Sequence, residues 1–261
     1  MKVQDLFNMT GRVAVVTGGG THLGKAMAES LAELGATVVI ASRRKELCEE
    51  VASEFRQRGL KCEATGCDVT VEAQVNDLVD AIVKRHGRLD AFICNAGGSV
   101  PAENTPDSSV DAFWKTVEMN VLSTFICVQA AARVMVKQGH GRIVTVGSIH
   151  GSMGTDKRMY TPGHKRSSIG YFAAKGGVVN LTRDLAAELG EYGITVNCLS
   201  PGQIPKPGVN PVLLERLEQR TPLRRNGVPE DLKGAIALLA SPAGAWISGQ
   251  DLRVDGAWSV W

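Results

Sequence analysis

Short apolar runs alternate along the chain with longer segments in which apolar residues recur every three or four positions. The short runs predict buried strands, and the longer segments predict amphipathic helices. Apolar strands in regular alternation with helices are typical of a parallel sheet that helices cover on both faces. We therefore predict a doubly wound α/β fold with strands at 12–17, 37–41, 61–67, 89–94, 142–147, 194–199 and 251–254, and helices at 23–34, 45–58, 71–85, 111–136, 168–190 and 229–240.

The alternation is not interrupted by a linker, a low-complexity tract or an internal repeat, which predicts one domain over residues 1–261. A chain of this length buries about three quarters of the surface of its unfolded form, so it needs no metal or disulfide. The cysteines form no Cys-x-x-Cys pair and no cluster with histidine, so we expect no metal site. We interpret them as small buried apolar side chains in a reducing compartment. The six are Cys48, Cys62, Cys67, Cys94, Cys127 and Cys198.

Charge and hydropathy exclude several partners. The net charge of +2 gives no basic surface of the kind that binds nucleic acid. No apolar run approaches the roughly 20 residues of a membrane span, and residues 1–11 lack the apolar core of a signal peptide. We expect a cytoplasmic protein with a small-molecule substrate and neither a nucleic-acid nor a membrane partner.

The turn between the first predicted strand and helix, Thr17–Gly24, reads Thr-Gly-Gly-Gly-Thr-His-Leu-Gly. Glycines let the backbone reverse tightly and bring its N–H groups within reach of a pyrophosphate, because a Cβ atom would block that approach. The N-terminus of the following helix adds partial positive charge. The turn therefore predicts a dinucleotide site with contacts from Gly18, Gly20, Thr21, His22, Leu23 and Gly24.

Further motifs follow in order: Asp68-Val69, Cys94-Asn95-Ala96-Gly97, Asn120, Tyr171-Phe-Ala-Ala-Lys175, and Asn197 with Ser200-Pro201-Gly202. This set resembles the short-chain dehydrogenases/reductases over almost the whole chain. The resemblance implies a Rossmann fold, an NAD or NADP cofactor, hydride transfer between a ketone and a secondary alcohol, and a homo-oligomer, usually a tetramer. It implies cofactor contacts from Asp68, Val69, Asn95, Ala96, Gly97, Tyr171, Lys175, Pro201, Gly202 and Ile204.

The glycine-rich turn departs from the family pattern at one position. His22 stands where the family usually has glycine, so a side chain is present where most members have none. It either points away from the phosphates or contacts one. We favour a turn residue that tolerates an unusual φ.

Tyr171 and Lys175 are suited to proton transfer. Hydride transfer to a ketone leaves an oxygen that needs a proton, so an acid must lie beside it. Tyrosine ionises near pH 10, and a nearby positive charge lowers that value. Among the three tyrosines, only Tyr171 has a lysine four residues later, one helical turn away. We therefore predict Tyr171 as the acid/base and Lys175 as the charge that lowers its pKa.

The resemblance adds two residues to this pair. It assigns Ser148, at the end of a predicted strand, as a hydroxyl donor to the substrate oxygen, and Ser152 and Ser200 compete for that role. It assigns Asn120 to a water that links Lys175 to solvent. Alternatively, Asn120 is a polar residue that satisfies backbone groups at a helix break.

Ser148 and Tyr171 are 23 positions apart, farther than in most members of the family. The extra segment, about 153–167, contains Gly154, Pro162 and Gly163 and therefore predicts a loop. Since both of its ends are catalytic, it must lie near the mouth of the site. Its charges either attract an anionic substrate or are simply solvated. The basic residues are Lys157, Arg158, His164, Lys165 and Arg166.

Cofactor preference depends on the end of the second strand, which carries Ser42, Arg43 and Arg44. An acidic residue here favours NAD, because it accepts hydrogen bonds from the ribose hydroxyls. A serine followed by arginines suits a 2′-phosphate instead, so we predict NADP in preference to NAD. Alternatively, the arginines only begin a surface helix.

Substrate identity has the weakest signal. Lys206 stands where the family often has threonine. The extra loop, the Pro-Gly-Gln-Ile-Pro-Lys-Pro run and the tail 254–261 resemble gluconate and other sugar-acid dehydrogenases. A 3-oxoacyl thioester reductase is the rival enzyme, and a non-catalytic dinucleotide-binding sensor or scaffold is the alternative of another class. We expect Trp258 and Trp261 to seal a subunit interface or to cover a pocket.

Overall fold

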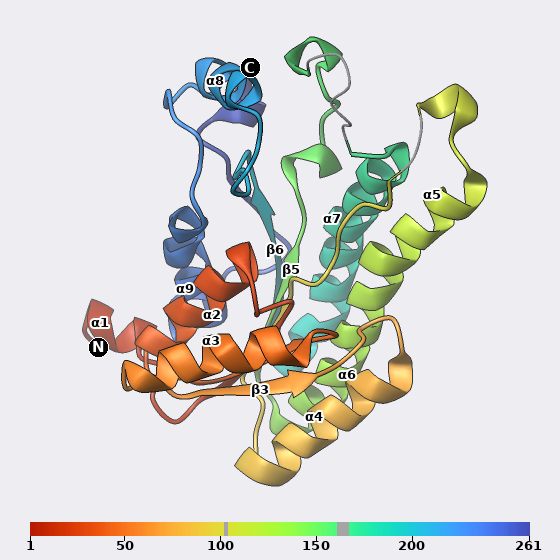
Figure 1. The fold of residues 1–261 in the computed structure, drawn as a ribbon. Helices are drawn as coiled ribbons and strands as arrows, with labels where there is room; N and C mark the ends of the chain where they lie inside the picture. The colour runs from red at the N-terminus through yellow and green to blue at the C-terminus, as the bar shows by residue number, and fades with distance from the viewer. Residues whose placement is uncertain (102–103, 161–166) are drawn as a thin grey trace.

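The structure is a computed structural model that describes residues 1–101, 104–160 and 167–261. A seven-stranded sheet in the order β3-β2-β1-β4-β5-β6-β7 forms its centre, and every neighbouring pair of strands is parallel. The predicted doubly wound Rossmann-type fold is therefore confirmed (Figure 1). The strands are β1 Val13–Thr17, β2 Thr37–Ser42, β3 Cys62–Gly66, β4 Ala91–Cys94, β5 Gly141–Val146, β6 Ile194–Pro201 and β7 Asp251–Val254.

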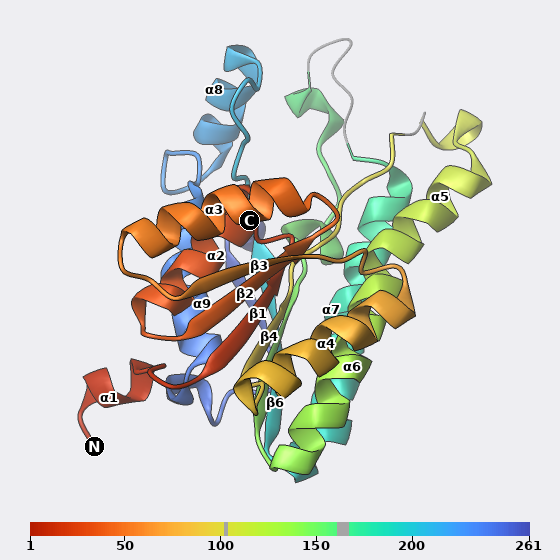
Figure 2. The same cartoon turned by 60° about the horizontal axis from the view of Figure 1, so that its bottom comes forward.

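Helices cover both faces of the sheet (Figure 2). Alternate residues of one strand enter different cores, because successive side chains of a strand point to opposite faces. Val16 packs with α2, α3 and α9, whereas Val15 packs with α4, α6 and α7. The helices are α1 Val3–Phe7, α2 His22–Glu33, α3 Lys45–Gln57, α4 Glu72–His86, α5 Val110–Val117, α6 Ser123–Gln138, α7 Ile169–Leu189, α8 Pro211–Arg220 and α9 Lys233–Ala240.

Four helical segments differ from the sequence prediction. The predicted helix 111–136 is divided by a π-helical turn, Glu118–Leu122, and the helix expected from residue 229 begins with the 3₁₀ turn Pro229–Leu232. The sequence prediction missed α1 and α8. Helix α8 begins with a proline and an Asn210 side-chain cap, but it buries only Leu213 and Leu217, so its apolar periodicity is weak.

The segment Val110–Gln138 is long and apolar enough to cross a membrane, by length and composition only. The expectation that no segment reaches this level is wrong by that measure. Half of the segment is buried inside the fold, however, and core helices of soluble proteins satisfy the same criterion. The finding therefore gives weak support for a membrane span.

All six cysteines are buried and free, as the sequence analysis predicts. Within the described ranges, no group of three or more histidine, cysteine, aspartate or glutamate side chains is arranged to hold a metal ion.

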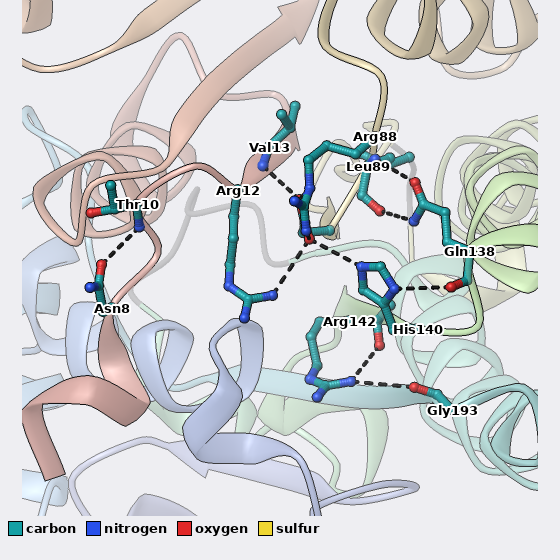
Figure 3. Close-up of polar contacts among 12 residues, drawn as sticks. Asn8, Thr10, Arg12, Val13, Arg88, Leu89, Gln138, His140, Arg142 and Gly193 are labelled. Carbon is teal, nitrogen blue, oxygen red and sulfur yellow. Dashed lines mark hydrogen bonds and ion pairs between the residues drawn. The ribbon is translucent and has the colours of Figure 1, made fainter. Parts of the chain in front are cut away.

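Asp90 organises the amino-terminal edge of the sheet. The residues whose groups surround its carboxylate, Arg12, Val13, Arg88 and His140, are labelled in Figure 3. Its carboxylate accepts hydrogen bonds from the Val13 backbone, from Arg88 and from the His140 ring, and Arg12 lies 3.5 Å away. Burial favours a higher Asp90 pKa, but these hydrogen bonds outweigh burial and lower it. The network ties β1, β4 and β5 together and leaves the opposite, carboxyl-terminal edge for ligands.

Candidate active site

A cavity of about 680 Å³ lies at the carboxyl-terminal edge of the sheet. Its volume is within the range of roughly 300–1,000 Å³ that is typical of ligand sites. Nearly all of the predicted site residues line it, although they come from segments that are far apart in the sequence. Those lining it are Gly18, Thr21, His22, Leu23, Gly24, Ser42, Arg43, Arg44, Asp68, Val69, Asn95, Ala96, Gly97, Ser148, Tyr171, Lys175, Pro201, Gly202 and Ile204.

Two predicted residues do not line the cavity. Gly20 faces α3, since a Cβ atom there would lie 3.1 Å from the Cys48 sulfur. Asn120 is buried in the π-helical turn, where its amide donates to the carbonyls of Thr116 and Gly98 and accepts from the Gly98 N–H. These hydrogen bonds show that Asn120 satisfies backbone groups at a helix break, and the water link to Lys175 stays a prediction.

The glycine-rich turn is held by Asn95. The Asn95 amide donates to the carbonyls of Thr17 at 2.8 Å and Gly18 at 3.3 Å, and Thr17 Oγ1 accepts from the backbone N–H of Asn95. Gly18 has a φ of 66°, and a Cβ atom on Gly24 would collide with the Gly18 carbonyl oxygen. Glycine is therefore required at Gly18 by the backbone conformation and at Gly24 by close packing.

His22 has a φ of 47°, which agrees with the favoured interpretation of a turn residue in an unusual conformation. Its side chain is not idle, because Nε2 lies 3.1 Å from the Ile204 carbonyl oxygen. That contact joins the glycine-rich turn to the segment after β6.

The far end of the cavity carries Ser42, Arg43, Arg44 and Asp68. The Ser42 hydroxyl accepts from the Arg44 backbone N–H at 3.1 Å, which fixes the turn after β2. Burial favours a higher Asp68 pKa, but hydrogen bonds from Thr70 and the charge of Arg43 lower it. Neither guanidinium has a hydrogen bond or ion pair with another described residue, so both can meet an anionic group.

Tyr171, Lys175 and Ser148 form the opposite end. Lys175 lies one turn after Tyr171 on α7, with Nζ 5.6 Å from the centre of the tyrosine ring. The Ser148 hydroxyl lies close enough to the Tyr171 phenol to affect its pKa. Ser148 is placed by the end of β5, and its Oγ accepts from the His150 backbone N–H.

The pKa of Tyr171 differs from the sequence prediction. Burial raises it, and the hydrogen bond with Ser148 opposes that effect only in part. Lys175 does not lower it, since Nζ donates to the Val146 carbonyl at 2.7 Å rather than to the phenol. Lys175 is itself buried, which lowers its pKa to about 8. The phenol therefore stays protonated in the protein alone.

Neither His150 nor Tyr160 was predicted from the sequence as a residue of this cavity. Both line the cavity beside Ser148 and Tyr171. The His150 ring packs against Phe172, and burial lowers its pKa to about 4, so it is neutral near pH 7. The signal available for His150 was its position two residues after Ser148, on a 3₁₀ turn that faces the same site.

Of the basic side chains in the extra loop, the structure describes only Arg158. Arg158 is exposed and paired with Asp156 at 2.8 Å, and it does not line the cavity. His164, Lys165 and Arg166 lie outside the described residues, as does the side chain of Lys157. Lys206 does line the cavity, and it has no ion pair among the residues described.

Trp258 is buried against Ile149, Leu213 and Leu217. It lines a small cavity that shares His150, Tyr160 and Gln203 with the large one, so its role in covering a pocket stays a prediction. Trp261 is exposed in the single chain.

Comparisons with known proteins agree with this geometry. A family model described as enoyl-(acyl carrier protein) reductase matches residues 20–259. The chain is 33% identical to 7alpha-hydroxysteroid dehydrogenase of Escherichia coli (strain K12), over 97% of this chain and 96% of that protein. It is 34% identical to gluconate 5-dehydrogenase of Gluconobacter oxydans (strain 621H), over 100% of this chain and 99% of that protein.

A solved structure is similar to this chain over its whole length. The crystal structure of a gluconate 5-dehydrogenase from Burkholderia cenocepacia J2315 in complex with NADP and tartrate has a TM-score of 0.90 and 31% identity. The match covers 100% of both chains. The chain belongs to the short-chain dehydrogenase/reductase family and is an oxidoreductase. Structures within this similarity hold either NADP or NADH, so the family's cofactor class is NAD(P).

Proposed function

We propose that this oxidoreductase interconverts a ketone and a secondary alcohol, with Tyr171 as the acid/base. One observation carries the proposal. The Tyr171 phenol lies beside Ser148 and Lys175, at one end of a cavity whose other end suits a dinucleotide. A non-catalytic sensor would have no need to bury a lysine beside that phenol.

The residues of the cavity fit a nicotinamide dinucleotide. Backbone groups of the turn Gly18–Gly24 would hold its pyrophosphate, and the region around Asp68 its adenosine end. The turn keeps its tight shape because Gly18 and Gly24 lack side chains, which would meet Asn95 and the Gly18 carbonyl. When bound, the nicotinamide would exchange a hydride with the substrate carbon.

The chain's own groups handle the proton. In reduction, Tyr171 donates its phenolic proton to the carbonyl oxygen as that oxygen becomes an alcohol. Ser148 donates a hydrogen bond to the same oxygen and stabilises its developing negative charge. The Lys175 ammonium is held by the Val146 carbonyl, with Nζ 5.6 Å from the centre of the Tyr171 ring, and Asn120 keeps the neighbouring Gly97–Gly98 backbone in place. Since burial raises the Tyr171 pKa, the free protein is prepared for the reduction direction.

The experiment is a comparison of the protein with its Tyr171→Phe variant, in which cofactor oxidation is followed with a panel of carbonyl compounds. Loss of the acid/base should lower kcat by about 10²–10⁴-fold, while cofactor binding persists. Equal activity in the two proteins would refute the assignment and would support the sensor or scaffold alternative.

We propose NADP as the preferred cofactor. Ser42 offers no carboxylate to the ribose, and the unpaired Arg43 and Arg44 guanidiniums suit a 2′-phosphate. In a Ser42→Asp variant, the new carboxylate should repel that phosphate and accept hydrogen bonds from the ribose instead. Fluorescence titrations should give tighter binding of NADPH than NADH in the parent and the reverse order in the variant. Tighter NADH binding by the parent would contradict the preference.

We propose a compact, polar and anionic substrate, such as a sugar acid. Lys206, Gln203 and the neutral His150 line the substrate end, which supplies one cation and several hydrogen-bonding groups. The relatives include gluconate 5-dehydrogenases, and one of these was solved with tartrate. Lys206→Met should raise KM for gluconate-type acids about tenfold, whereas Lys206→Arg should not. A preference for 3-oxoacyl thioesters in the same panel would favour the rival function.

We further propose a cytoplasmic homotetramer. Apolar side chains are exposed on α5, the π-helical turn and α6, a face that a second copy of the chain would cover. Mass photometry should give four times the chain mass of 27.8 kDa, and a monomer would contradict this proposal. The exposed residues are Val110, Trp114, Leu122 and Phe125.

A further inference from the structure

His22 occupies a backbone conformation that side chains rarely adopt. Its φ of 47° lies in the left-handed region, where glycine is favoured because it has no Cβ atom. Only two other non-glycine residues among those described have a positive φ, Arg224 and Ala257. Neither of those two lines the large cavity, whereas His22 does. Strain of this kind at a ligand site indicates that the side chain contributes something there.

The imidazole of His22 spans two walls of the cavity. Nε2 lies 3.1 Å from the Ile204 carbonyl oxygen, 182 positions later in the sequence. A carbonyl can only accept a hydrogen bond, so Nε2 carries the hydrogen and donates. One wall is the glycine-rich turn at the start of α2, and the other is the segment that follows β6.

The acceptor is itself firmly placed. The Ile204 side chain packs against the core that α2 and α9 form on this face of the sheet. Next to it, the Gln203 carbonyl accepts from the Gly227 N–H at 3.0 Å, and the Gly202 N–H donates to the Val254 carbonyl at 2.9 Å. The segment after β6 is therefore anchored on its outer side, and His22 is its connection to the phosphate-binding turn.

We propose that His22 is a positioning residue for the dinucleotide: its hydrogen bond to Ile204 holds the phosphate-binding turn and the segment after β6 at the separation that the cofactor needs. The inference rests on the dinucleotide site of the proposed function and adds a residue to it. His22 adopts an unfavourable φ, and in return its hydrogen bond keeps the two walls of the cofactor site from moving apart.

The test uses two substitutions with opposite consequences. His22→Gly removes the ring and also relieves the backbone, so the melting temperature without cofactor should stay the same or rise. NADPH should nevertheless bind about three- to tenfold more weakly, mainly through faster dissociation, because one hydrogen bond across the site is lost. His22→Gln retains an N–H at a similar reach and should restore most of the affinity. A merely structural residue would lower stability and affinity together.

Ala257→Gly is the matched control, since it relieves a left-handed position that does not line the cavity. Its NADPH affinity should equal that of the parent. The proposal is overturned if His22→Gly binds NADPH as tightly as the parent, or if His22→Gln binds as weakly as His22→Gly. Failure of the proposed function is a different result, namely a parent protein that binds no nicotinamide dinucleotide.

Discussion

Replacement of Lys175 by methionine tests how strongly the fold opposes a charge at the site. Lys175 is buried beside Tyr171, and burial lowers its pKa from 10.5 to about 8. Between these values the unfolded chain binds a proton that the folded protein does not. The stability of the parent therefore rises with pH across this window and is lowest below about pH 8, where both states carry the charge.

The pKa difference converts to about 3 kcal/mol of folding free energy at 1.36 kcal/mol per tenfold change in proton affinity. Lys175→Met keeps the length of the side chain but has no titratable group, so it should lack this dependence. Other ionising groups are common to both proteins and largely cancel in the difference. The lost hydrogen bond to Val146 adds an offset that does not change with pH.

The measurement is urea unfolding of parent and variant without cofactor, at one protein concentration and at about pH 7.5, 9 and 10.5. The parent should gain about 3 kcal/mol relative to Lys175→Met across the series. The variant should also lose at least about a hundredfold in kcat. A stability difference that stays constant with pH would refute the claim that the lysine is buried as a charged group.

Three further predictions follow from other contacts in the structure. Asp90→Asn should lower the free energy of unfolding by about 3 kcal/mol, because the buried carboxylate and its hydrogen bonds are lost. The parent should lose this stabilisation as pH falls through the lowered Asp90 pKa, so the variant should be less sensitive to acid, and acid unfolding curves that superimpose would contradict this. Gly24→Ala should weaken NADPH binding about tenfold or more because its Cβ collides with the Gly18 carbonyl, whereas Gly234→Ala, which meets nothing within 4 Å, should bind normally. The six cysteines should resist alkylation in the folded protein and react in urea, because all are buried and burial raises the pKa of Cys62 and Cys67 to about 12. Rapid labelling of the native protein would show that this packing is wrong.

The sequence by itself determined the order of strands and helices and the identity of most site residues. Short apolar runs and apolar positions that recur every three or four residues are local patterns, so they can be read without coordinates. The glycine-rich turn Thr17–Gly24 and the Tyr171–Lys175 pair are also local motifs, since each lies within a few consecutive residues. Parallel strands then bring their carboxyl ends to one edge, which places separate motifs in one cavity.

Only the tertiary structure decided what surrounds each of these groups. The direction of the Tyr171 pKa depends on burial and on the turn of Lys175 toward Val146, neither of which the spacing of four residues reveals. The contact between His22 and Ile204 joins positions that no local pattern connects. The sequence shows Arg158 as a basic residue of the extra loop, but only the structure shows that it forms an ion pair with Asp156. Burial and pairing are properties of the packed chain, because they depend on which distant residues fold against a given side chain.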